Sequence, residues 1–129
     1  MNYYSLEGNA PYVSFKEAVI NGIAPDKGLY FPESIKSLPT GFFNELTTLS
    51  KNEIAFQLIQ PFVGSSIPKE TLENIINETL DSEFPLIPLT DRISSLELYH
   101  GPTLAFKDVG ARFMARCLGY FTALDSKEK

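Results

Sequence analysis

Apolar residues recur at intervals of three and four in several stretches of the chain, and this spacing predicts amphipathic helices. A first short helix is predicted after Ser14, because Ser14 and Glu17 have the spacing of a capping box and Gly22 offers a stop. Ser50 and Glu53 repeat that spacing. A second helix is therefore predicted after Ser50, with its apolar stripe interrupted by Pro61 and Gly64.

Two further helices follow from the same period. Pro68 stands near the start of a third stretch, whose apolar stripe extends to Leu80. The fourth stretch keeps the helical period from Phe106 to Leu124 and includes Cys117. We expect this last helix to be long and well buried, with Cys117 in the core, although part of its apolar face is either exposed or covered by a partner chain.

Short apolar runs indicate strands. The segment from Gly28 to Pro32 suits a short strand or an extended crossing segment. Leu86 to Leu89 and Leu96 to Tyr99 predict two strands around a turn formed by the polar stretch from Thr90 to Ser95. The predicted fold is an α+β or mixed α/β arrangement, rich in helices, with short strands that belong to sheets completed elsewhere.

Composition narrows the class of protein. The 129 residues are 43% hydrophobic and 21% charged, which is typical of a chain that folds. A net charge of -5 and a pI near 4.8, with no basic stripe, argue against nucleic-acid binding. One cysteine, Cys117, permits neither an intrachain disulfide nor a cysteine-based metal cluster, so a reducing, cytoplasmic setting is expected. We expect neither export by a visible signal nor a membrane span.

The chemistry is concentrated in HGPTLAFKDVGAR, from His100 to Arg112. Lys107 is predicted in the first turn of the last helix, where the positive end of the helix dipole disfavours an ammonium and favours the carboxylate of Asp108. Schiff-base chemistry needs a neutral amine, and burial beside a positive potential lowers a lysine pKa toward the working pH. The alternative is an ordinary solvated lysine at a helix start.

The residues near Lys107 also suggest possible roles, some with more than one interpretation. Gly110 and Ala111 give the helix face beneath Lys107 two very small side chains, which leaves room for a planar ring. Thr103 is placed to cap the helix, although its hydroxyl could also meet an anion. Asp108 and Arg112 have the spacing of a helical ion pair. His100 is the only histidine and no nucleophile stands at a telling spacing from it, so a catalytic dyad that includes it has no support.

These residues also carry a family resemblance. The run LELYHGPTLAFKDVGARFMAR resembles the block around the cofactor lysine of threonine synthases, and VSFKEAVINGIAPDKGLYFP, EIAFQLIQPFVG and FPLIPL resemble earlier blocks of that family. The resemblance implies a pyridoxal-phosphate (PLP) enzyme of fold type II in which Lys107 forms the Schiff base. It also implies conversion of O-phospho-L-homoserine and water to L-threonine and phosphate, with His100 and Thr103 as substrate contacts.

The resemblance covers essentially the whole chain, with small departures. Tyr99 stands where the family pattern has Phe, and Lys27 where it has Gly. Members of the family are several times longer, which implies that the phosphate cradle of PLP follows Lys129 and that this chain is a fragment, inactive by itself. We expect residues 1–95 to form the family's amino-terminal domain and residues 96–129 to begin the PLP-binding α/β domain.

Two other interpretations stay open at this point. Another PLP-dependent lyase or dehydratase of the same fold group would share the lysine and differ in the leaving group of its substrate. Alternatively, the isolated chain is a non-catalytic folding or interaction domain. No metal site and no particular oligomeric state are indicated.

Overall fold

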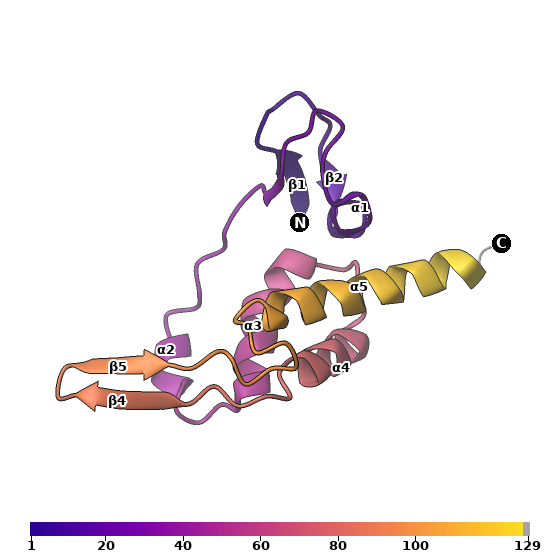
Figure 1. The fold of residues 1–129 in the computed structure, drawn as a ribbon. Helices are drawn as coiled ribbons and strands as arrows, with labels where there is room; N and C mark the ends of the chain where they lie inside the picture. Colours follow the sequence, from indigo (N-terminus) through magenta and orange to yellow (C-terminus); the bar gives the residue numbers. More distant parts are fainter. Residues whose placement is uncertain (128–129) are drawn as a thin grey trace.

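The protein has a mixed α/β fold in which two small antiparallel sheets flank a group of helices (Figure 1). The structure is a computed structural model, and it describes residues 1–127. Over those residues the elements are β1 (Asn2–Ser5), β2 (Val13–Ser14), α1 (Phe15–Asn21), β3 (Tyr30–Pro32), α2 (Phe42–Glu45), α3 (Lys51–Val63), α4 (Lys69–Thr79), β4 (Leu86–Thr90), β5 (Ile93–Leu96) and α5 (Asp108–Lys127). The predicted fold class is confirmed.

The first sheet is built around β1. Tyr3 in β1 pairs with Val13 in β2 on one side and with Pro32 in β3 on the other, so the strand order is β2-β1-β3. The Tyr3 hydroxyl donates a hydrogen bond of 2.9 Å to the carbonyl of Phe62, which attaches the sheet to α3. Burial raises the pKa of Tyr3 to about 12. The predicted strand in 28–32 is confirmed, and β1 and β2 are additions to the prediction.

Both predicted capping boxes form. The Ser14 hydroxyl accepts from the amide of Glu17 and the Glu17 carboxylate accepts from the amide of Ser14, and Ser50 and Glu53 repeat the pattern at α3. These hydrogen bonds hold the pKa of each glutamate below its usual value. Helix α3 continues through Pro61 as far as Val63, so the proline does not end it.

The core lies where α5 crosses the other helices. Cys117 and Phe121 of α5 are fully buried, and the Phe15 ring of α1 meets the Phe121 ring edge-on with centroids 6.1 Å apart. The cluster consists of Val63, Ile67, Leu72, Ile75, Ile76, Cys117 and Phe121. Met114 and Leu118 on another face of α5 are exposed, so the expectation of a well-buried helix holds for one side only. The expected place of Cys117 in the core is confirmed.

Ion pairs join α5 to its neighbours. The Arg112 guanidinium lies 2.5 Å from the carboxylate of Asp81, just beyond α4, and Arg116 lies 2.8 Å from Glu78. At the other end of α5, Asp125 accepts a hydrogen bond of 2.6 Å from Lys16. The predicted pair between Asp108 and Arg112 is wrong, because Arg112 reaches across to the end of α4 instead.

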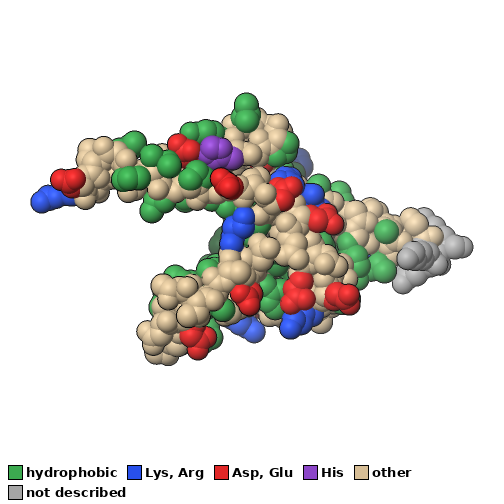
Figure 2. Space-filling model, turned by 90° about the horizontal axis from the view of Figure 1, so that it is seen from below, with side chains coloured by type: hydrophobic (Ala, Val, Ile, Leu, Met, Phe, Trp, Pro, Cys, Tyr) green, Lys and Arg blue, Asp and Glu red, His purple; other side chains and the backbone are tan. Residues whose placement is uncertain are grey.

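The second sheet is the β4–β5 hairpin, which projects from the helices (Figure 1). Leu86 pairs with Leu96, and the chain turns at Asp91 and Arg92. The second strand of the pair, β5, covers Ile93–Leu96, whereas the prediction was Leu96 to Tyr99. The prediction lies too far toward the carboxyl end, because the apolar run begins where the paired segment ends. Hydrophobic side chains gather along this arm, the upper one in Figure 2. No helix in the described part of the chain is long and apolar enough to span a membrane.

Candidate functional site

Lys107 is the last residue before α5. Its carbonyl accepts the first helical hydrogen bond, 3.0 Å from the amide of Ala111, so Lys107 occupies the N-cap position. The predicted start of this helix at Phe106 is therefore two residues early. The Lys107 side chain is exposed and makes no hydrogen bond or ion pair with the residues that the structure describes. The chain thus presents a primary amine to solvent beside the positive end of the α5 dipole.

Asp108 follows Lys107 and is buried, with 7% of its surface exposed. Its carboxylate accepts hydrogen bonds from the hydroxyl of Thr103 and, at 2.9 Å, from the amide of Thr103. These two bonds hold the pKa of Asp108 below its usual value, against an opposing effect of desolvation. A carboxylate in the first turn is also favoured by the helix dipole.

Thr103 does not cap α5, contrary to one prediction for this residue. Lys107 is the N-cap residue, and Thr103 lies four positions earlier, where its amide and hydroxyl donate to Asp108. An anion could use these two donors only by displacing the Asp108 carboxylate. Sequence reasoning missed this pairing, although a threonine five residues before a helix-starting aspartate is a local signal for it.

His100 lies at the beginning of the same loop. Its Nε2 is 2.7 Å from Oε2 of Glu97, and its ring stacks on the ring of Tyr99 with centroids 4.7 Å apart. Hydrogen bonds from His100 and then Tyr99 lower the pKa of Glu97, and the same contact with Glu97 raises the pKa of Tyr99. His100 therefore has a hydrogen-bond partner within its own loop region, and it forms a small polar group with Glu97 and Tyr99.

The surroundings of Lys107 are apolar and open. Leu104 is 75% exposed and Phe106 is 66% exposed, so hydrophobic side chains flank the amine on the surface. A Cβ atom added at Gly110 would meet no other atom within 4 Å. An exposed primary amine and the open space beside Gly110 are compatible with a flat aromatic aldehyde such as PLP.

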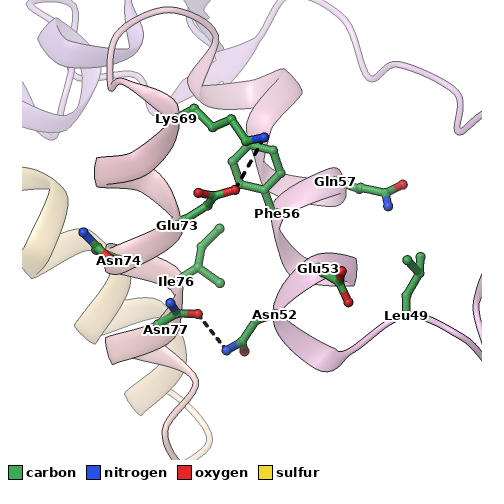
Figure 3. Close-up of a pocket in the computed structure, with 10 residues that line it drawn as sticks. All are labelled: Leu49, Asn52, Glu53, Phe56, Gln57, Lys69, Glu73, Asn74, Ile76 and Asn77. Carbon is green, nitrogen blue, oxygen red and sulfur yellow. Dashed lines mark hydrogen bonds and ion pairs between the residues drawn. The ribbon is translucent and has the colours of Figure 1, made fainter.

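A separate groove of about 420 Å³ lies between α3 and α4 (Figure 3). In it the Asn52 amide donates a hydrogen bond of 2.7 Å to Asn77, and Lys69 lies 3.8 Å from Glu73 and above the ring of Phe56. Some polar groups of this groove are thus matched with one another, whereas Oδ1 of Asn52 is buried with no hydrogen-bond partner among the described residues. Its lining residues do not include Lys107, and they supply no group for the chemistry predicted at the loop.

Comparisons with known proteins agree with the fold. The sequence profile described as "Threonine synthase N terminus" matches residues 2–80. Threonine synthase of Haemophilus influenzae is 38% identical over 118 residues, which are 92% of this chain and 27% of that protein. A PLP-bound threonine synthase from Brucella melitensis has a TM-score of 0.92 and 34% identity over 98% of this chain and 28% of its own.

Threonine synthase from Escherichia coli superposes similarly, with a TM-score of 0.88 and 34% identity over 95% of this chain and 28% of its own. The agreement in fold extends over 95% or more of this chain in both structures, and it indicates one kind of enzyme scaffold. The chain belongs to the threonine synthase family. It spans just over a quarter of the length of the relatives it matches.

Proposed function

We propose that this chain provides the amino-terminal part and the cofactor lysine of a threonine synthase, which converts O-phospho-L-homoserine and water to L-threonine and phosphate. The observation that carries the proposal is the sequence HGPTLAFKD, which places the Lys107 amine at the start of α5, where it is exposed and has no hydrogen bond or ion pair to the described residues. The relatives of this chain include a protein crystallised with PLP bound, and PLP enzymes use a lysine amine to hold the cofactor.

In this proposal Lys107 has two roles. Its Nζ holds PLP, which when bound acts as an electron sink for reactions at the substrate's alpha and beta carbons. Once the substrate's own amine has taken its place, the freed Lys107 amine moves protons at those two carbons. Because Lys107 is mounted at the start of a helix, its Cα is held in one place, from which its amine can reach both carbons.

We also propose His100 and Thr103 as substrate-binding residues, since they flank the loop that leads to Lys107. His100 would keep its hydrogen bond to Glu97 and offer its other ring nitrogen to the substrate. Thr103 would have to exchange its bonds with Asp108 for bonds to an anionic group. The first role needs no rearrangement of the loop, and the second role does.

Other parts of the proposal concern organisation and setting. We place the amino-terminal domain in residues 1–95 and the beginning of a PLP-binding domain in 96–129, and we propose that the 129 residues alone do not turn over substrate. The single cysteine supports a cytoplasmic location. The net charge of -5 supports a small-molecule substrate rather than a nucleic acid.

The test uses two proteins: the 129-residue chain, and a chimera in which this chain replaces the matching segment of the Escherichia coli threonine synthase. Each is mixed with PLP and reduced with borohydride, and the modified residue is mapped by mass spectrometry. We expect Lys107 of the chimera to be modified and Lys107→Ala to remove the label. Lys36→Ala, which changes an exposed lysine elsewhere, is the matched control. Absence of label on Lys107 of the chimera would sink the assignment.

Substrate choice separates the remaining alternatives. We expect the labelled chimera to release phosphate from O-phospho-L-homoserine and to process serine and threonine much more slowly. Equal turnover of serine would favour a PLP-dependent dehydratase of the same fold group. Labelling of the chimera but not of the 129-residue chain would show that the isolated chain is a folding or interaction domain.

A further inference from the structure

The loop from Gly101 to Lys107 is closed by contacts among its own residues. Asp108 accepts from the amide and the hydroxyl of Thr103, and the Asp108 amide donates to the carbonyl of Ala105 at 3.1 Å. The amide of Leu104 donates to the carbonyl of Gly101 at 3.1 Å, which forms a turn. Hydrogen bonds within the loop and hydrogen bonds to Asp108 at the start of α5 therefore both hold the loop in place.

The Asp108 carboxylate reaches further back from its helix than the Glu17 and Glu53 carboxylates of the two capping boxes do. A capping side chain normally accepts from amides of the helix that follows it. The Asp108 carboxylate instead accepts from Thr103, in the loop that precedes α5. Its bonds therefore fix the loop to the helix, which is a different task from stabilising the helix alone.

Backbone geometry gives an independent sign that the loop is fixed. Leu104 has a φ of 58°, in the left-handed region that residues with a side chain seldom adopt. Because its side chain is 75% exposed, burial of Leu104 does not hold this conformation. At Gly101 a Cβ atom would lie 2.9 Å from the Cβ of Asp108, so the turn requires glycine in order to approach α5.

We propose that, before substrate binds, the Thr103–Asp108 pair is a positioning device that fixes the direction in which Lys107 leaves the start of α5. The inference rests on the proposed function of Lys107. The exposed Lys107 side chain has no hydrogen bond or ion pair to a described neighbour that could orient it, so the backbone between Thr103 and Asp108 alone sets where the side chain begins and its initial direction. Neither Thr103 nor Asp108 is a catalytic residue in this role.

The test compares Thr103→Val and Asp108→Asn in the chimera, with Thr103→Ser as the conservative variant that keeps the hydroxyl. Thr122→Val and Asp125→Asn are matched controls, because these residues make similar side-chain bonds elsewhere on α5. Amide hydrogen exchange of the segment 101–107 is measured without PLP, and the occupancy of Lys107 is measured as a function of PLP concentration and pH. Circular dichroism confirms that each variant is folded.

We expect Thr103→Val and Asp108→Asn to speed exchange in the loop and to weaken PLP occupancy by on the order of tenfold to a hundredfold, with an altered pH profile. Thr103→Ser and both controls are expected to match the parent chimera. Occupancy that is equal in all variants, or reduced equally by the controls, would overturn the positioning role. If the parent chimera itself gives no adduct on Lys107, the proposed function fails, and the exchange data still report whether the pair fixes the loop.

Discussion

The two halves of α5 differ sharply in their environment. Around Cys117 and Phe121 the helix is enclosed by α1 and α4, and both side chains are fully buried. At its start, Phe106 and Lys107 lie on the surface, and the loop before them is held by the Thr103–Asp108 pair. One helix thus serves as a structural element in its middle and as a platform for an exposed amine at its beginning.

This difference teaches that stability and the proposed chemistry depend on different residues. The buried half owes its position to apolar contacts, which are many and do not depend on any single polar group. The start of α5 depends on a few hydrogen bonds between residues close in sequence. Substitutions can therefore separate the two roles.

The largest expected effect is in the buried half. Phe121→Ala removes a fully buried ring that contacts Phe15, and we expect it to lower the free energy of unfolding by about 3–5 kcal/mol. Phe106→Ala, which changes an exposed ring, is the control and should leave stability nearly unchanged. Urea unfolding followed by circular dichroism measures both. Similar losses in the two variants would contradict the comparison.

A smaller effect is expected at the start of α3, which supports the buried half. Ser50→Ala removes the hydroxyl that accepts from the amide of Glu53, and a lost cap of this kind costs about 1 kcal/mol. The same urea experiment applies. Ser34→Ala, in the exposed segment before α2, is the control and is expected to have no measurable effect.

Acid stability tests the bond between α4 and α5. The Arg112 hydrogen bond lowers the pKa of Asp81 from 3.8 to about 2, so ionised Asp81 stabilises the folded state above pH 3.8 and loses that effect as the pH falls toward 2. Asp81→Asn should flatten the change in unfolding free energy over this range. Asp91→Asn, at the hairpin turn, is the control. An unchanged slope in Asp81→Asn would contradict the assigned role of the pair.

The smallest effect on stability is expected at Lys107 itself. Its side chain is exposed and has no hydrogen-bond partner among the described residues, so Lys107→Ala should change the free energy of unfolding by less than about 0.5 kcal/mol. The same substitution abolishes PLP labelling in the chimera under the proposed function. A large loss of stability would show that Lys107 contributes to the fold and would weaken the separation between the two halves.

Local signals predicted the helices well and the strands less well. Ser14 and Ser50 identify helix starts because each capping box lies within four residues, and both boxes form. Strand β1 was missed because its partners are remote: Tyr3 pairs with Pro32, and no local pattern records that pairing. Helix α2, with four residues, is too short to show a period.

At the site, sequence reasoning identified Lys107 and the importance of its loop but not the loop's internal bonds. Spacing along a helix suggested that Arg112 pairs with Asp108, whereas Arg112 bonds to Asp81 across the interface with α4. Helical spacing describes only neighbours on the same helix. The bond between Arg112 and Asp81 joins α5 to the end of α4, so it depends on the tertiary arrangement and was not predictable, whereas the missed Thr103–Asp108 pair is local.

The β4–β5 hairpin has a consequence for handling the protein. It is a two-stranded ribbon with exposed leucine and isoleucine side chains, including Leu86, Leu89 and Ile93. Both outer edges of such a ribbon carry backbone groups that another extended chain can pair with, and exposed apolar edges of this type promote aggregation. Solubility, more than folding stability, is therefore the property that substitutions in this hairpin are expected to change.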